Sequence, residues 1–285
     1  MTRKKDNMTN EQKEKILKDI ESGMSHREIA KQENVGLATI SKVRNANQPY
    51  ERWLLVPDIH GADGDDTALN ILDDFKKDFK PHHTVFFGDL INADAVSKYD
   101  SHGGPTLEQE YGTANAILDR FKPDIFLEGN HEERLRRPGL VKKELVDVLS
   151  PTKWLNIDKR KIRWYPYTND PDKILRVGHL TMIHGFAFNE HACKTEAQCF
   201  GCVVHAHTHR IATYQPKNAY HNHTGFNIGC LCKLNLGYQS TGIPRGWAQG
   251  FAYSYLFPDG NFSLYQVRLI NDNIVINDKV YKRGI

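Results

Sequence analysis

A chain of 285 residues, 39% of them hydrophobic, is long enough for one large domain and a smaller accessory domain. The 38 basic residues nearly balance the 35 acidic ones, so the formal net charge of +3 does not itself indicate polyanion binding. No apolar run reaches the length of a membrane span, and we expect neither a membrane anchor nor a secretory signal. Five cysteines, an odd number, fit a reducing compartment, so we expect a cytoplasmic protein.

Two capping boxes predict two short helices near the N-terminus. Thr9 with Gln12, and Ser25 with Glu28, have the spacing in which a hydroxyl caps a helix and the later side chain reaches back. The second helix should end near Asn34, because asparagine tolerates the left-handed backbone of a turn.

A third helix is predicted over residues 37–44, and the whole segment resembles the helix-turn-helix of resolvases and sigma-like regulators. The resemblance depends on small Ala30, on Asn34 where glycine is usual, and on the apolar residues Val35, Ile40 and Val43. It implies a DNA-recognition helix with polar or basic outward side chains, namely Thr39, Ser41, Lys42 and Arg44. The alternative is a three-helix bundle used for docking or for forming a homodimer.

Apolar runs alternate with helical patterns after a polar linker at residues 45–48, which ends a first domain of residues 1–48. Buried strands are predicted over residues 53–56, 84–87, 125–127, 180–183 and 202–204, and helices over residues 66–79, 107–121 and 132–149. Residues 251–257, 262–270 and 274–281 should form antiparallel hairpins that complete a second sheet. Residues 49–285 are therefore predicted to be an α/β domain, a two-sheet sandwich flanked by helices.

Polar residues of metal-binding type follow each buried strand. They form the motifs Asp58-Ile59-His60, Gly88-Asp89, Gly129-Asn130-His131-Glu132, His184-Gly185 and His205-Ala206-His207-Thr208-His209. Open α/β sheets bind ligands at the carboxyl ends of their strands, and residues i and i+2 of an extended segment point the same way. Asp58 with His60, and His207 with His209, can therefore each present two metal ligands on one face.

The order of these motifs over residues 53–210 resembles the calcineurin-like metallophosphoesterase family. By position, the resemblance implies that Asp58, His60 and His209 hold one metal and that Asn130, His184 and His207 hold a second, with Asp89 bridging both. His131 would stabilise the transferring phosphoryl group or protonate the leaving oxygen, and Glu132 and Asn92 would orient the site without binding metal. Stand-alone chains of this kind also resemble those encoded by bacterial viruses.

The expected site carries a net positive charge. Two divalent ions bring four positive charges, and Asp58 and Asp89 are the only carboxylates among the expected ligands. Such a site attracts phosphate and lowers the pKa of a bridging water. Mixed nitrogen and oxygen ligands suit manganese, iron or zinc better than magnesium or calcium, and we expect manganese.

Three functions remain open. We favour a phosphodiesterase or nuclease acting on DNA that the N-terminal domain delivers. The first alternative is a phosphomonoesterase acting on nucleotides or phosphoproteins, although Asn92 stands where Ser/Thr protein phosphatases carry an aspartate followed by arginine. The second alternative is a DNA-binding regulator with a vestigial catalytic domain, and the complete set of expected ligands argues against it.

Two further groups give weaker indications. Arg134, Arg136 and Arg137 should lie at the mouth of the site, where they could steer a polyanion. Cys199 with Cys202, and Cys230 with Cys232, have spacings that a structural metal site can use. Neither pair has the turn glycines of a zinc knuckle, so we expect buried apolar cysteines instead.

Overall fold

The computed structural model describes residues 8–46, 49–97, 104–217, 223–235, 246–270 and 273–282. The chain divides into two compact units, Met1–Tyr50 and Glu51–Ile285. Each unit is described by itself. No helix among the described ranges combines the length and the apolar character needed to cross a membrane.

The first unit contains three helices, α1 (Asn10–Glu21), α2 (His26–Gln32) and α3 (Leu37–Ala46). Both predicted capping boxes are confirmed, because the Thr9 and Ser25 hydroxyls accept hydrogen bonds from the backbone N–H groups of Gln12 and Glu28. Asn34 has a φ of 50°, the left-handed backbone expected at the turn. The helices enclose a small core of Ile16, Ile29, Ile40 and Val43.

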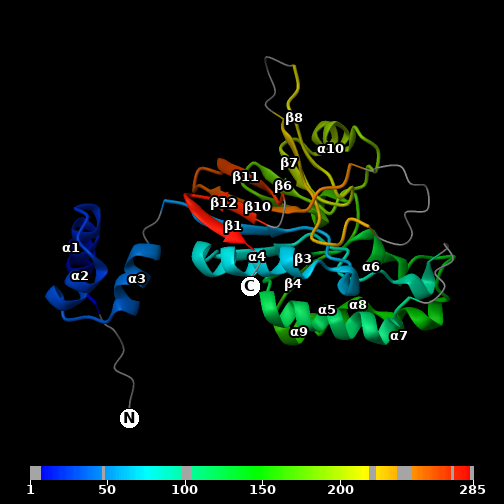
Figure 1. The fold of residues 1–285 in the computed structure, drawn as a ribbon, viewed down its shortest axis with the longest axis horizontal. Helices are drawn as coiled ribbons and strands as arrows, with labels where there is room; N and C mark the ends of the chain where they lie inside the picture. Colours follow the sequence, from blue (N-terminus) through cyan, green and yellow to red (C-terminus); the bar gives the residue numbers. More distant parts are fainter. Residues whose placement is uncertain are drawn as a thin grey trace, which may run out of the picture. The chain divides into compact units, whose positions relative to one another are not determined.

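The second unit contains a six-stranded sheet in the order β11-β10-β1-β2-β3-β4 (Figure 1). Its strands are β1 (Glu51–Val56), β2 (His83–Phe86), β3 (Ile125–Leu127), β4 (Arg163–Tyr165), β10 (Gly250–Leu256) and β11 (Phe262–Arg268). The first four are parallel, β10 runs antiparallel to β1, and β11 runs antiparallel to β10.

A second sheet of five strands has the order β5-β6-β7-β9-β8. Its strands are β5 (Leu175–Val177), β6 (Leu180–Met182), β7 (Val203–His205), β8 (Ile211–Tyr214) and β9 (Gly225–Ile228). A separate hairpin of β12 (Asn273–Ile276) and β13 (Lys279–Lys282) pairs with itself.

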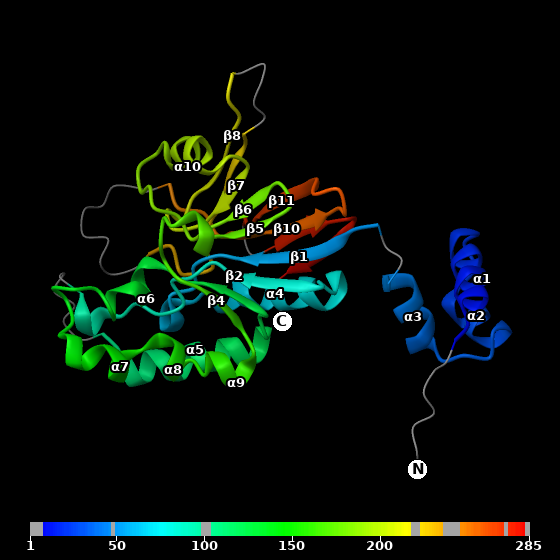
Figure 2. The same ribbon diagram turned by 180° about the vertical axis from the view of Figure 1, so that it is seen from behind.

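Helices cover the outer faces of the two sheets. Helices α4 (Asp66–Phe79), α5 (Leu107–Phe121), α7 (Val146–Leu149), α8 (Pro151–Trp154) and α9 (Ile157–Arg160) lie on the six-stranded sheet's side, and α10 (Ala192–Phe200) lies on the side of the five-stranded sheet (Figures 1 and 2). Helix α6 (Asn130–Arg134) follows β3 directly. Short 3-10 helices occur at Gly61–Asp63, Asp94–Val96, Lys143–Leu145 and Pro171–Lys173.

Alternate side chains of β1 point to opposite faces of the first sheet, so this strand contributes to the two apolar cores on either side of it. Leu54 and Val56 pack in the core that includes α4 and α5, whereas Trp53 and Leu55 pack in the core between the sheets. All of these side chains are buried. A strand that is buried on both faces has a continuous run of apolar residues. The apolar run at residues 53–56 predicted such a strand for this reason. The α/β sandwich with flanking helices is therefore confirmed.

Three expectations about the second unit are wrong. Residues 274–281, expected to be one strand, contain parts of the two strands β12 and β13, which pair with each other. Strands β10 and β11 extend the first sheet beside β1 and do not complete the second one, because an alternating strand pattern does not specify which sheet edge it joins. The helix predicted over residues 132–149 is interrupted after Arg134, where Pro138 cannot donate a backbone hydrogen bond and Gly139 has a φ of 89°. A 3-10 helix at Lys143–Leu145 then leads into α7.

Replacing Ile29 with alanine should unfold the first unit selectively. Ile29 is fully buried in the three-helix core, so the change should lower the stability of this unit by about 2–5 kcal/mol. Hydrogen exchange should accelerate throughout residues 10–46 and stay unchanged over residues 51–285. Lys31→Ala, which removes an exposed side chain from the same helix, is the control. Equal acceleration in both units would contradict independent folding.

Candidate metal centre

The loops after five buried strands bring aspartate, asparagine and histidine side chains together. Asp58 and His60 follow β1, Asp89 follows β2, Asn130 and His131 begin α6 after β3, His184 follows β6, and His207 and His209 follow β7. Several of these residues have left-handed backbone, with φ of 58° at His60, 46° at Asp89, 66° at His207 and 56° at His209. Such backbone costs about 1–3 kcal/mol for a residue other than glycine and persists where the surrounding structure fixes it.

A first group of possible metal ligands consists of Asp58, His60 and His209. Their ligand atoms all lie within 4.8 Å of one another, and all three residues are buried. The Nε2 atoms of His60 and His209 are 3.0 Å apart, and Oδ2 of Asp58 lies 3.0 Å from Nε2 of His209. Burial opposes ionisation of Asp58, but His184 and His209 hold the pKa of its carboxyl below its ordinary value.

A second group consists of Asp89, His184 and His207, again within 4.8 Å. Nε2 of His184 lies 3.2 Å from Nδ1 of His207, 3.3 Å from Oδ2 of Asp89 and 3.0 Å from Oδ1 of Asn130. Asp89 is also grouped with His60 of the first set and with His131, so this carboxylate lies between the two sets.

These residues fit a pair of metal ions. Pairs of ring nitrogens face each other inside the protein, and two lone pairs at this separation repel unless a proton or a cation lies between them. Burial lowers the pKa of His60, and lowers the pKa of His207 to about 4, so both rings present the neutral form that binds metal. The His131 and His184 side chains outweigh burial and hold the pKa of Asp89 well below its ordinary value.

Glu132 joins the loops that carry Asp89 and Asn130. Its buried carboxylate accepts hydrogen bonds from the backbone N–H groups of Asp89, Leu90, Ile91 and Gly129, at 2.7–3.2 Å. A Cβ atom at Gly129 would lie 2.1 Å from Oδ1 of Asp89, so only glycine permits this approach of the two loops. Glu132 therefore holds the two ligand-bearing loops together through their backbone N–H groups.

Asn92 supports the first group and is itself held by Glu110. Oδ1 of Asn92 lies 2.6 Å from Nδ1 of His60, which leaves Nε2 of that ring free to face His209. The Glu110 carboxylate accepts the backbone N–H groups of Asn92 and Ala93 at 2.8 and 2.7 Å. Glu110 was not predicted as a site residue. Its position on the buried face of an amphipathic helix, beside Tyr111 and Ala114, is unusual for a carboxylate and could have indicated a structural role.

His131 lies at the edge of the site with its side chain 16% exposed. Its Nδ1 donates to the backbone oxygen of Asn92 at 2.8 Å, and Nη2 of Arg134 lies 3.1 Å from its Nε2. Burial lowers the pKa of His131 to about 3, so the ring is neutral and its Nε2 can accept a hydrogen bond. Its Nε2 is 3.7 Å from Oδ2 of Asp89.

The arginines after His131 have different surroundings. Arg136 pairs with the buried Glu128 carboxylate through Nε at 3.0 Å, and Arg137 pairs with Glu133 through Nε at 2.6 Å. Arg134 instead contacts His131 and the backbone oxygen of Asn92. Of the three arginines, Arg134 is therefore the one beside the candidate site.

The remaining predicted residues lie elsewhere. In the first unit, Ser41, Lys42 and Arg44 are exposed on α3 and Thr39 is half-buried. None of the five cysteines forms a disulfide. Cys230 and Cys232 are buried as expected, but Cys199 is exposed and Cys202 is half-buried, so that expectation is wrong for the other pair. Within the described ranges, Cys199 and Cys202 join no group of possible metal ligands, whereas Cys230 and Cys232 lie close to His209. The structure therefore does not gather the four cysteines into one site.

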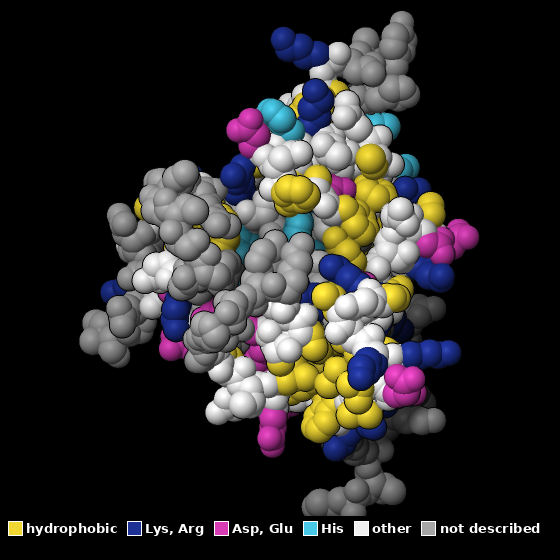
Figure 3. Space-filling model, turned by 90° about the vertical axis from the view of Figure 1, so that its right-hand side faces the viewer, with side chains coloured by type: hydrophobic (Ala, Val, Ile, Leu, Met, Phe, Trp, Pro, Cys, Tyr) yellow, Lys and Arg dark blue, Asp and Glu magenta, His cyan; other side chains and the backbone are white. Residues whose placement is uncertain are grey.

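Histidine side chains are visible near the centre of one face of the molecule (Figure 3). Lysine and arginine side chains on this face are scattered and do not form one patch. The visible surface thus gives no broad basic track for a polyanion.

Comparison with known proteins gives a family match. The calcineurin-like phosphoesterase family matches residues 52–210, which contain every proposed ligand. The chain belongs to the calcineurin-like phosphoesterase family, whose members hydrolyse phosphate esters with divalent metals.

Solved structures similar to the chain are distant. They include an archaeal phosphodiesterase with 15% identity and a TM-score of 0.39, covering 76% of this chain and 99% of its own. They also include the phosphoesterase Yfce from E. coli with 12% identity and a TM-score of 0.35, covering 76% of this chain and 99% of its own. No curated protein matches the chain.

Replacing Glu132 with glutamine should destabilise the second unit and weaken metal binding. An amide offers one acceptor oxygen, so part of the buried backbone N–H set would face an NH₂ group instead. We expect a loss of about 1–3 kcal/mol, with a fall in Tm of about 2–4 °C for each kcal/mol.

The neighbouring change Glu133→Gln is the matched control, because the half-buried Glu133 pairs with the exposed Arg137. Thermal unfolding and metal analysis of both variants measure the difference. Equal Tm values for the two variants would contradict the supporting role of Glu132.

Proposed function

We propose that the chain is a dinuclear metallophosphoesterase. One metal would be held by Asp58, His60 and His209, and the other by Asn130, His184 and His207, with Asp89 shared between them. The observation that carries the proposal is the position of Asp89, which lies within 4.8 Å of ligand atoms of both sets.

The charges of the proposed site suit a phosphate ester. When bound, two divalent ions supply positive charge that polarises the phosphoryl group and lowers the pKa of water. Asp58 and Asp89 are the only carboxylates in the proposed ligand set, so the loaded site stays net positive and binds anions. Glu132 and Asn92 keep the ligand-bearing loops and the His60 ring in place. Nitrogen and oxygen donors suit manganese, with iron or zinc as alternatives.

His131 is proposed to act on the substrate. Its ring lies at the edge of the site, beside Asp89 and Arg134, without belonging to either proposed ligand set. Its Nδ1 is committed to the backbone oxygen of Asn92, and its Nε2 faces Nη2 of Arg134, so a phosphoryl oxygen or the leaving group would replace the Arg134 contact at Nε2. A proton moved at Nε2, or a hydrogen bond held there, would stabilise the transition state.

DNA is the substrate we favour, with the first unit delivering the active site. The support for this is the exposed polar and basic surface of α3, at Ser41, Lys42 and Arg44, and the capped three-helix arrangement with a left-handed turn at Asn34. The five free thiols fit a reducing compartment such as the cytoplasm. A phosphomonoesterase acting on nucleotides or phosphoproteins, with the three helices forming a homodimer, is the alternative.

Two substitutions separate the metal-binding and substrate-binding roles. Asp89→Asn should abolish hydrolysis and lower bound manganese, because this carboxylate is proposed to hold both ions. His131→Ala should keep bound manganese near the wild-type amount and lower kcat by about 10²–10⁴-fold.

The assay uses purified protein with manganese and a panel of single-stranded DNA, duplex DNA, mononucleotides and a phosphopeptide. Wild-type hydrolysis of the DNA substrates supports the nuclease function, and hydrolysis of the monoesters alone supports the alternative. Normal turnover with two tightly bound ions in Asp89→Asn would overturn the dinuclear assignment. Loss of metal in His131→Ala would make His131 a ligand.

A charge-matched pair of variants tests delivery by the first unit. Lys42→Ala with Arg44→Ala should weaken DNA binding and reduce its salt dependence by roughly 0.9 in log–log slope for each lost phosphate contact. Lys13→Ala with Lys18→Ala removes the same charge from exposed positions of α1 and should change binding less. Hydrolysis of a small phosphodiester should be unchanged in both proteins. Equal DNA affinity for the two double variants would contradict a recognition role for α3.

A further inference from the structure

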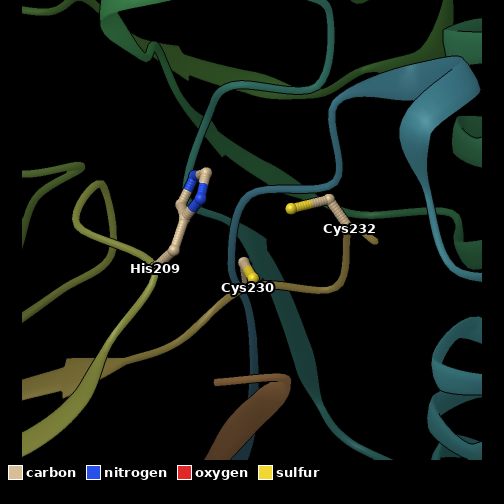
Figure 4. A group of neighbouring side chains, drawn as sticks. All are labelled: His209, Cys230 and Cys232. Atoms are coloured by element: carbon tan, nitrogen blue, oxygen red, sulfur yellow. The ribbon is translucent and has the colours of Figure 1, made fainter. Parts of the chain in front are cut away.

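Beside the first ligand group lies a second kind of donor cluster, made of His209, Cys230 and Cys232. One ligand atom from each residue lies within 4.8 Å of the other two, and all three residues are buried. Figure 4 shows them next to one another, with His209 on the loop after β7 and the cysteines on the segment after β9. The family pattern described above uses neither cysteine.

The two ring nitrogens of His209 have different surroundings. Nε2 faces His60 and Asp58 in the first ligand group. Nδ1 is buried and has no hydrogen-bond partner among the described residues. A buried polar atom without a partner costs about 1–3 kcal/mol, so a ligand at Nδ1 would remove an existing penalty.

The cysteine segment is held rigidly against the same loops. The backbone N–H of Leu231 donates to the backbone oxygen of Asp58 at 2.7 Å, and that of Cys230 donates to Ala248 at 3.2 Å. Gln249 donates through Nε2 to the backbone oxygen of Cys232 at 2.9 Å. Hydrogen bonds within the protein therefore hold the backbone that carries the two thiols near His209.

Apolar surroundings favour a soft metal ion whose charge is neutralised by its ligands at this cluster. Both cysteines are 0% exposed and pack against Trp247. The centroids of the Trp247 and His209 rings are 4.2 Å apart. Two thiolates balance the charge of a divalent ion, and sulfur donors select thiophilic cations such as Zn²⁺ over Mn²⁺. Cys230 and Cys232 are not joined in a disulfide, so both sulfur atoms can bind the same metal ion.

We infer that Cys230, Cys232 and Nδ1 of His209 form a third metal site, selective for a thiophilic divalent cation of the Zn²⁺ class. Binding releases the two thiol protons. When Nε2 already holds the first metal, it also releases the proton on Nδ1, so the His209 ring would bridge the two metals as an imidazolate. His209 then joins this site to the proposed dinuclear centre through its two nitrogens. Occupancy fixes the orientation of the His209 ring and changes how strongly Nε2 donates to the first metal.

Cobalt is the probe, because Co²⁺ bound to thiolate has a near-ultraviolet charge-transfer band that nitrogen and oxygen ligands do not produce. Metal-free full-length protein is reloaded with Co²⁺ under reducing conditions. We expect the band in the wild type, together with one more bound equivalent than the protein retains when both cysteines are replaced. The readout is sulfur ligation and not hydrolysis, so its failure is distinguishable from failure of the phosphoesterase proposal.

The chain offers a matched control in its other cysteine pair. Cys230→Ala with Cys232→Ala should lose the band and one equivalent of cobalt, whereas Cys199→Ser with Cys202→Ser should keep both. Alanine is used at the buried pair because it introduces no new polar atom, and circular dichroism checks that the variant folds.

Three outcomes would overturn the third site. They are absence of the band in fully loaded wild type, a band that survives in the Cys230 and Cys232 variant, and a band lost only in the Cys199 and Cys202 variant. If the Cys230 and Cys232 variant does not fold, the wild-type band and its retention in the control variant still decide the question.

Discussion

One buried carboxylate holds the ends of two neighbouring strands in the arrangement that the candidate site requires. Glu132 gathers backbone N–H groups from the loop after β2 and from the start of α6. Without this acceptor, those N–H groups would be buried and unpaired, and the hydrogen bond from the His131 N–H to Asp89 would have to hold the two loops together without them. Asp89 and Asn130 project from these two loops. The placement of a central proposed ligand thus depends on a residue whose side chain, in the described part of the chain, accepts hydrogen bonds from backbone N–H groups.

The layered fold supplies the rest of the arrangement. Parallel strands β1, β2 and β3 end at the same edge of the first sheet, and β6 and β7 run parallel to each other in the second sheet. The apolar core between the sheets, which includes Leu55 and Val204, keeps these edges together. Donors from loops far apart in the chain are therefore buried side by side, and bound cations would relieve their mutual repulsion.

The sequence predicted the layered α/β fold and the gathering of the candidate ligands, but it did not predict every strand pairing. Short motifs directly after apolar runs, such as Asp58 with His60, fix the local geometry that brings donors to one edge. The sheet joined by β10 and β11 depends on long-range pairing, which the strand pattern does not encode. Glu110 and the proximity of Cys230 to His209 depend on tertiary packing, and neither lies within a motif. The capping boxes at Thr9 and Ser25 were predictable because they involve only neighbouring residues.

The left-handed backbone at His60, Asp89, His207 and His209 lowers the stability of these loops, and the same residues supply the donor atoms of the candidate site. Glycine adopts this conformation without steric penalty, so glycine at any of these positions would relax the loop while removing a donor atom. Random substitution followed by selection for thermal resistance alone would therefore favour inert proteins at this site. The strained loops persist only while the donor atoms are required, and their geometry distinguishes a maintained site from a decaying one.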